Sequence, residues 1–272
     1  MQEYRSIELN LKVGCPVGCL YCPQDKFVKS NFGTKRELSR VDLMKILDNL
    51  THGQNEAEVF FAAMSEPFSH KECVNLIEDC QNHEFVTRVV VFTTGYRLTE
   101  EQIERLANFD KLKMNFHVGK KDCMPNFDEG IWQKIEKIKK MMPKSEFINV
   151  GFEKDCDLEL SLNEKGVELK FQPIISRAGN LVSVGNAALD SCLVNHPVTC
   201  PRVKDTKRPV ILPDGTALAC ANDYSCELKI GNLLESTWED LDFEKIIKLQ
   251  AKPCSMPCFR GCHYAKKEPK IL

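Results

Sequence analysis

The feature that most constrains the fold of this 272-residue chain is a repeated alternation of short apolar stretches with amphipathic patterns up to about residue 175. In residues 6–11, apolar and polar side chains alternate, which is typical of a β-strand. Strands that alternate with helices favour a parallel sheet joined by right-handed crossovers. Five further strands are expected, at residues 58–63, 88–94, 112–118, 147–152 and 167–173.

The segments between these strands carry apolar residues at helical spacing. Thr99 and Gln102 form a capping box, which predicts that a helix begins just after Thr99. Further helices are expected around residues 43–50, 73–80, 131–142 and 156–165. Six strands are fewer than the eight that close a full barrel, so we predict an α/β fold with a partial (β/α)6 barrel.

After residue 176 the alternation ends and a cysteine-rich segment follows, with seven cysteines from Cys192 to Cys262. The change of pattern predicts a domain boundary near residues 180–190. We therefore expect the partial barrel over residues 1–185 and a small cysteine-rich domain over residues 186–272.

Charge and hydropathy exclude several classes of protein. The formal net charge of −2 argues against a nucleic-acid surface, which needs a basic excess. No apolar run approaches the roughly 20 residues that cross a bilayer, and charges interrupt the first ten residues, where a signal peptide is apolar. We expect a cytoplasmic protein, in which 14 cysteines favour metal or redox chemistry over disulfides.

Three cysteines, Cys15, Cys19 and Cys22, lie within eight positions of one another directly after the first predicted strand. Active sites of α/β proteins lie in such loops, at the carboxyl ends of parallel strands. A structural zinc site uses four ligands, whereas three thiolates on a 4Fe–4S cluster leave one iron open for another ligand. The spacing favours the cluster, with structural zinc as the alternative.

The segment CPVGCLYC, together with its place after strand one, resembles the signature loop of the radical S-adenosylmethionine (radical SAM) superfamily. In that family the amino and carboxylate groups of S-adenosylmethionine chelate the open iron. An electron from the cluster then yields a 5′-deoxyadenosyl radical, which abstracts hydrogen from the substrate. The resemblance implies this chemistry here, with the protein orienting the substrate and excluding water.

The resemblance also implies contacts with S-adenosylmethionine at the ends of the following strands. The turn at Ser65 and Glu66 stands where relatives carry a Gly-Gly-Glu-like turn, and the missing glycines leave its contact geometry open. Thr93 and Thr94 precede a glycine in a turn that resembles the family's Thr-Asn-Gly. The implied cofactor-binding residues are Tyr21, Ser65, Glu66, Thr93, Thr94, Asn115 and His117, with residues 149–152 beneath the adenine.

The C-terminal segment is similar to the Twitch and SPASM extensions of radical SAM enzymes, which bind auxiliary iron–sulfur clusters. Asp214-Gly215 predicts a hairpin turn whose second strand delivers Cys220. One auxiliary 4Fe–4S cluster needs four ligands, so one of five candidates is spare, and structural zinc remains the alternative. The candidates are Cys200, Cys220, Cys254, Cys258 and Cys262.

Three interpretations of the function follow. The first is a radical SAM oxidoreductase that dehydrogenates a small polar substrate, such as a sugar or aminocyclitol. The second is an enzyme that modifies a peptide or protein, in which Cys226 donates a hydrogen atom as in family epimerases. The third is a non-catalytic metal-binding protein. Because the first strand begins close to Met1, no leader-binding domain is expected, which favours the first interpretation, with flavodoxin or ferredoxin as electron donor.

Overall fold

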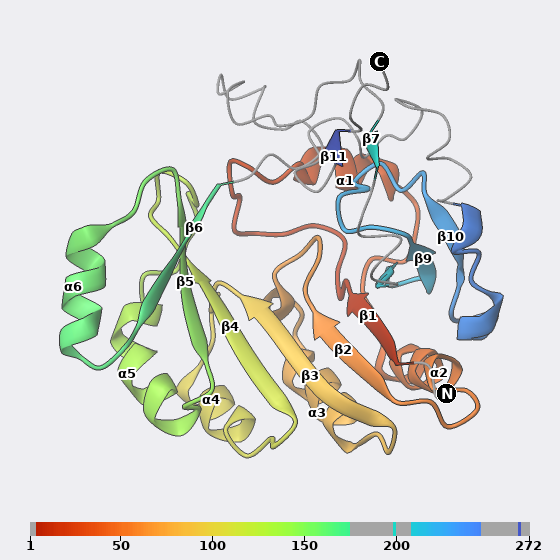
Figure 1. Cartoon of the computed structure of the whole chain (residues 1–272), viewed down its shortest axis with the longest axis horizontal. Coiled ribbons are helices and arrows are strands. Elements are labelled where there is room, and N and C mark those ends of the chain that lie inside the picture. Colours follow the sequence, from red (N-terminus) through yellow and green to blue (C-terminus); the bar gives the residue numbers. More distant parts are fainter. Residues whose placement is uncertain (1–3, 175–197, 200–207, 246–265, 268–272) are drawn as a thin grey trace.

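A single curved sheet forms the centre of the molecule, shown by a computed structural model that describes residues 4–174, 198–199, 208–245 and 266–267. Strands β1 to β6 lie side by side in chain order and are all parallel (Figure 1). Their bounds are Arg5–Leu9, Ala57–Phe61, Val86–Thr93, Leu112–Val118, Glu146–Gly151 and Leu169–Pro173. The six predicted strands and the parallel α/β architecture are confirmed.

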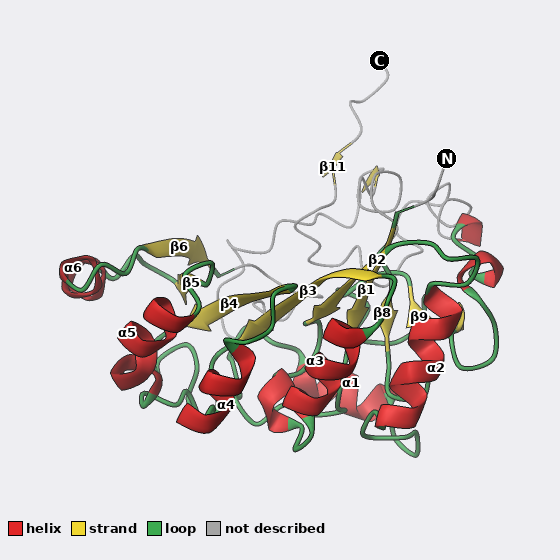
Figure 2. Ribbon diagram, turned by 90° about the horizontal axis from the view of Figure 1, so that it is seen from below, coloured by secondary structure: helices red, strands yellow, loops and turns green. Residues whose placement is uncertain are grey.

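Helices α2 to α5 cover one face of this sheet, as Figure 2 shows, and α6 lies beyond β6 at the end of the sheet. The predicted helices are present, as α2 (Arg40–Leu50), α3 (Cys73–Asn82), α4 (Glu100–Leu106), α5 (Ile131–Met141) and α6 (Cys156–Glu164). Helix α1 (Gln24–Ser30) was not predicted, because its seven residues bury only Phe27 and show no periodicity. Among the described residues, no helix has the length and apolar character that a bilayer crossing requires.

The core lies between the sheet and the helices that cover it. Along β4, Leu112, Met114 and Phe116 point into this core, so Asn115 and His117 occupy the opposite face by the two-residue period of a strand. Cys73 and Cys80 are 1% and 0% exposed on α3 and belong to this core. The polar face of β4 can therefore contribute side chains to a site on the side of the sheet opposite this core.

The predicted capping box of α4 is also confirmed. Gln102 N donates to Thr99 Oγ1 at 3.2 Å, and Thr99 N donates to Gln102 Oε1 at 3.0 Å. Two donors that a helix start leaves unpaired are thereby satisfied. The start of α4 fixes where the turn after β3 ends, and that turn belongs to the candidate site.

The C-terminal segment continues the barrel sheet beyond β1. Strand β8 (Val210–Ile211) pairs in parallel with β1, and β9 (Thr216–Leu218) and β10 (Lys229–Asn232) follow in antiparallel order. The predicted hairpin turn is confirmed, with Gly215 at a φ of 82°. Strand β1 is therefore an inner strand. Two remaining strands, β7 (Val198–Thr199) and β11 (Lys266–Lys267), form a separate antiparallel pair, and the domain boundary near residue 185 lies outside the described residues.

Candidate active site

The loop that carries Cys15, Cys19 and Cys22 connects β1 to α1 at the carboxyl end of the sheet. Gly14 and Gly18 have φ values of 99° and 71°, the left-handed region that glycine adopts without strain. Cys22 N donates to Cys19 O at 3.0 Å and closes the turn between the second and third cysteines. All three cysteines are partly buried, and none forms a disulfide within the described residues.

A segment after β4 holds this loop in place through three hydrogen bonds. Leu20 N donates to Cys123 O at 3.0 Å, and Asn126 N donates to Val17 O at 3.1 Å. The Asn126 side chain also donates from Nδ2 to Pro16 O at 2.8 Å. The cysteine loop is thus fixed by an element more than 100 residues away in sequence, as the support of a preorganised site requires.

The donor set of the loop consists of three thiols, the normal protein ligands of an iron–sulfur cluster. In the described part of the chain, no three His, Cys, Asp or Glu side chains converge at the spacing of one metal ion. A cluster bonds each thiolate to a different iron, so its ligands stand farther apart than those of one ion. Burial raises the pKa of Cys15 to about 11, and nearby Glu66 and Cys22 add to the rise. A thiol of this kind loses its proton when it binds a metal.

Glu66, which follows β2, connects two loops of the site. Its Oε1 accepts hydrogen bonds from Thr93 Oγ1 (2.5 Å) and Phe68 N (3.1 Å). Its Oε2 accepts from Thr94 N (2.8 Å) and Thr94 Oγ1 (2.9 Å). Burial raises the pKa of Glu66, and these hydrogen bonds oppose the rise. Glu66, Thr93 and Thr94, three of the residues predicted to bind cofactor, are thus brought together. The Glu66 carboxylate accepts most of its hydrogen bonds from the turn after β3.

The glycine of that turn, Gly95, has a φ of 75°, and a Cβ there would lie 2.5 Å from Ile131 Cδ1. Gly95→Ala is expected to lower the free energy of unfolding by about 2–4 kcal/mol, through backbone strain and overpacking. Gly166→Ala is the control, because Gly166 also has a positive φ, of 72°, but has open space around it. Backbone strain alone should lower the free energy of unfolding by only about 1–2 kcal/mol there. Equal losses in urea denaturation would contradict the packing argument.

Among the described residues, the buried polar atoms without a hydrogen-bond partner include three near the carboxyl ends of β2, β4 and β5, namely Ser65 Oγ, Asn115 Oδ1 and Asn149 Oδ1. Such an atom costs about 1–3 kcal/mol, so a polar ligand that satisfies it binds favourably. Two of the three were predicted cofactor contacts, and they follow or lie on β2 and β4. His117, two residues after Asn115, packs edge-on against Phe92 at 5.4 Å between ring centroids. The residues present fit the predicted S-adenosylmethionine site.

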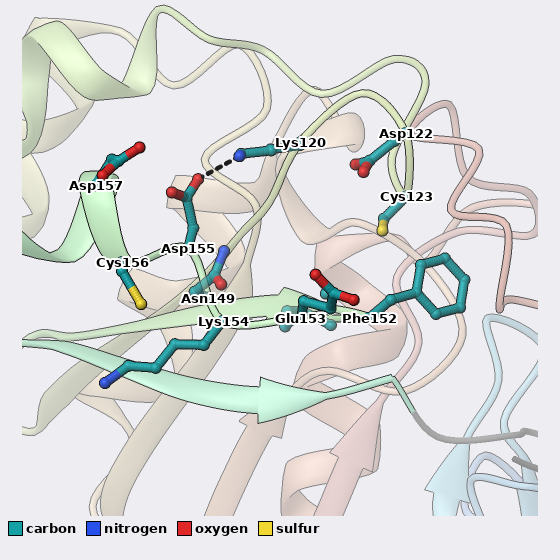
Figure 3. A pocket seen from close by; sticks show the side chains of 12 residues that line it. Lys120, Asp122, Cys123, Asn149, Phe152, Glu153, Lys154, Asp155, Cys156 and Asp157 are labelled. Atoms are coloured by element: carbon teal, nitrogen blue, oxygen red, sulfur yellow. Dashed lines mark ion pairs between the residues drawn. The ribbon is translucent and has the colours of Figure 1, made fainter.

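Asn149 also lines a cavity of about 420 Å³ at the ends of β4 and β5 and the start of α6. Figure 3 shows Asn149 beside Asp155, whose carboxylate pairs with Lys120 Nζ at 2.7 Å. Asp155 also caps α6 by accepting from Leu158 N. In open α/β sheets, ligands bind outside the carboxyl ends of the strands, where this cavity lies.

In the C-terminal segment, Cys220 and Cys226 flank a turn and are 5% and 6% exposed. Cys226 has a φ of 55°, its Sγ accepts a hydrogen bond from Asn31 Nδ2 at 3.2 Å, and burial raises its pKa to about 11. It shares a small apolar cluster with Val13 and Phe27, against which Cys22 packs. The other predicted ligands, Cys200, Cys254, Cys258 and Cys262, lie outside the described residues, so the auxiliary site stays a prediction.

Three residues of the site were not singled out from the sequence. Tyr224 OH lies 3.8 Å from Cys22 Sγ, and Gln24 Nε2 donates to the same sulfur at 3.5 Å. Asn149 was expected only as part of a strand beneath the adenine. Gln24 stands two residues after a cysteine, which is a local signal, whereas nothing near Tyr224 in sequence points to Cys22. Tyr21, a predicted cofactor contact, is partly buried against the main core.

Comparisons with known proteins identify a family and a shared fold. A family model described as the Radical SAM superfamily matches residues 9–163. A structure of BtrN in complex with AdoMet and 2-DOIA is 16% identical, with a TM-score of 0.61 over 97% of this chain and 94% of that chain. A structure of Streptococcus suis SuiB bound to precursor peptide SuiA is 12% identical, with a TM-score of 0.61 over 94% of this chain and 68% of that chain. A structure of native anSMEcpe with bound AdoMet and Cp18Cys peptide is 16% identical, with a TM-score of 0.60 over 92% of this chain and 84% of that chain. No curated protein matches.

Proposed function

Because the chain belongs to the radical SAM superfamily, whose enzymes use a 4Fe–4S cluster and S-adenosylmethionine, we propose that it oxidises a small polar substrate such as a sugar or an aminocyclitol. The cysteine loop beside unpartnered polar atoms at the carboxyl end of the sheet carries this proposal. When bound, the two cofactors supply a 5′-deoxyadenosyl radical that removes a hydrogen atom from a substrate carbon. A non-catalytic metal-binding protein does not account for the family membership.

The chain's own residues take three roles in this proposal. Cys15, Cys19 and Cys22 hold the cluster, and the segment after β4 keeps their loop in place. The unpaired oxygens of Ser65 and Asn115 accept hydrogen bonds from S-adenosylmethionine, and His117 and Tyr21 are further proposed contacts. Glu66, Thr93 and Thr94 form the hydrogen-bonded wall beside them.

Oxidation of a hydroxyl-bearing carbon to a carbonyl requires the loss of a second electron and a proton after the hydrogen atom has gone. An auxiliary cluster held by four of Cys200, Cys220, Cys254, Cys258 and Cys262 would accept that electron. A separate electron, the one that would drive the reductive cleavage of S-adenosylmethionine, comes from a carrier such as flavodoxin or ferredoxin. The similarity to BtrN supports this assignment, because it spans nearly the whole of both chains.

Modification of a peptide is the second candidate, supported by the peptide-bound structures of SuiB and anSMEcpe. Their TM-scores of 0.61 and 0.60 are close to that of BtrN, whereas the similarity covers only 68% and 84% of their chains. The fold alone therefore accommodates either substrate class.

Replacing Cys226 with alanine distinguishes the two candidates. An epimerase that depends on this thiol stalls and gives products without the newly transferred hydrogen, whereas a dehydrogenase keeps its turnover within about threefold, because only a buried thiol is lost. Product analysis by mass spectrometry in D₂O is the measurement. The iron content of the variant is the control for loss of a cluster.

The proposed function itself is tested by anaerobic reconstitution. We expect about eight irons per chain, from two 4Fe–4S clusters, and cleavage of S-adenosylmethionine to 5′-deoxyadenosine on reduction. Added sugars or aminocyclitols should raise the yield of 5′-deoxyadenosine, whereas peptides should leave it unchanged. Protein that binds only zinc and leaves S-adenosylmethionine intact contradicts the proposal.

A further inference from the structure

We propose that Tyr224, in the C-terminal segment, donates a hydrogen bond to the Cys22 sulfur and raises the reduction potential of the cluster at the cysteine loop. The inference rests on the proposed function, because it takes Cys22 as a cluster ligand. In this inference the C-terminal segment changes the reduction potential of the cluster at the cysteine loop directly. This effect does not depend on any auxiliary cluster that the segment itself binds.

The contact is built into the fold. The Tyr224 side chain is 0% exposed, and its hydroxyl lies 3.8 Å from Cys22 Sγ, within the longer reach of hydrogen bonds to sulfur. Its ring meets Phe27 of α1 edge-on, with 6.3 Å between centroids and 84° between planes. Phe27 is itself fully buried and lies five residues after Cys22, so the same short stretch carries the ligand and the surface that positions the tyrosine.

A tight turn fixes the backbone around Tyr224. Asp223 N donates to Cys220 O at 3.1 Å, and Cys226 N donates to Asp223 O at 3.1 Å. The Asp223 side chain accepts from Leu228 N at 2.7 Å and from Ser225 Oγ at 3.2 Å. The hydroxyl is therefore held at the sulfur by a preorganised turn, which keeps the entropic cost of the hydrogen bond low.

The direction of this hydrogen bond follows from the chemistry of the ligand. A thiolate bound to iron has no proton and accepts only, so the tyrosine hydroxyl is the donor. Gln24 Nε2, at 3.5 Å, is a second donor to the same sulfur. Hydrogen bonds to cluster sulfurs stabilise the more negative, reduced state, and they are among the factors that set the reduction potential.

Tyr224→Phe removes the hydroxyl and leaves the ring in place. In redox titrations followed by EPR, without S-adenosylmethionine, we expect the ratio of reduced to oxidised cluster at a fixed potential to fall three- to tenfold. A tenfold fall corresponds to about 59 mV for one electron. Tyr4→Phe is the matched control, because Tyr4 is 55% exposed and precedes β1 at the opposite end of the sheet, so no shift is expected.

A second substitution covers the case in which Tyr224→Phe fails to bind the cluster. Site-specific 3-fluorotyrosine at position 224 has a more acidic hydroxyl, which is a stronger donor, so the ratio should rise. Unchanged potentials in a variant with full iron content and intact cleavage of S-adenosylmethionine overturn this inference alone. Wild-type protein without a cluster overturns the proposed function instead.

Discussion

Replacing Cys15, Cys19 or Cys22 with alanine is expected to abolish cleavage of S-adenosylmethionine and to remove the iron bound at this loop. Each thiolate is one of the three proposed protein ligands, so two remaining thiolates would leave the cluster without a stable attachment. The measurements are iron content, visible absorbance and 5′-deoxyadenosine yield after anaerobic reconstitution. A wild-type yield with any one cysteine removed contradicts the assignment.

Cys80→Ala is the matched control for this experiment. Cys80 is also a cysteine, but it is 0% exposed on α3, among the helices that cover the other face of the sheet. Its loss should leave iron content and cleavage at the wild-type level. If Cys80→Ala and Cys19→Ala lost iron equally, the loss would reflect general instability of the fold.

Replacing Glu66 with alanine is expected to lower the free energy of unfolding by about 3–5 kcal/mol, a large part of the stability of an ordinary domain. The substitution leaves the backbone donors of Phe68 and Thr94 and two threonine hydroxyls without their acceptor. Because the turn at Thr93 and Thr94 loses its anchor, affinity for S-adenosylmethionine should fall as well. Urea denaturation of the metal-free protein under reducing conditions measures the stability effect separately.

Two further variants test whether the lost hydrogen bonds of Glu66 cause the destabilisation. Glu66→Gln keeps the shape but turns one acceptor into a donor that faces other donors, so it should also destabilise the protein by about 1–3 kcal/mol. Glu78→Gln removes a partly exposed carboxylate that pairs with Arg105 on the helix side. We expect it to change the free energy of unfolding by no more than about 1 kcal/mol. A loss for Glu66→Ala no larger than that for Glu78→Gln would falsify the proposed role of the carboxylate.

Much of the barrel could be predicted from the sequence because its signals are local. The alternation of apolar and polar residues along β4 and the capping box at Thr99 each depend on residues within a few positions of one another. The cysteine loop could also be recognised from the sequence, because its three cysteines lie in a single short segment. The likeness of that segment to a known family then supplied the cofactors.

The features that were missed depend on contacts distant in sequence. Glu66 was expected to meet the cofactor, and only the fold shows that its oxygens already accept four hydrogen bonds, three from the turn after β3 and one from Phe68 N in its own loop. Tyr224 reaches Cys22 across 202 positions, which no periodicity reveals. Helix α1 is too short for a periodic signal, although it forms the surface on which Tyr224 packs.

The pairing of β8 with β1 limits how this enzyme can be divided. Strand β1 receives hydrogen bonds from β2 on one side and lies against β8 on the other, where Glu8 N donates to Pro209 O and Asn10 N donates to Ile211 O, each at 2.9 Å. A fragment that stops at residue 174 would expose that side as an unpaired edge, ready to join another chain. Biochemists who seek a minimal catalytic unit should therefore expect such a truncation to aggregate, and should shorten loops instead.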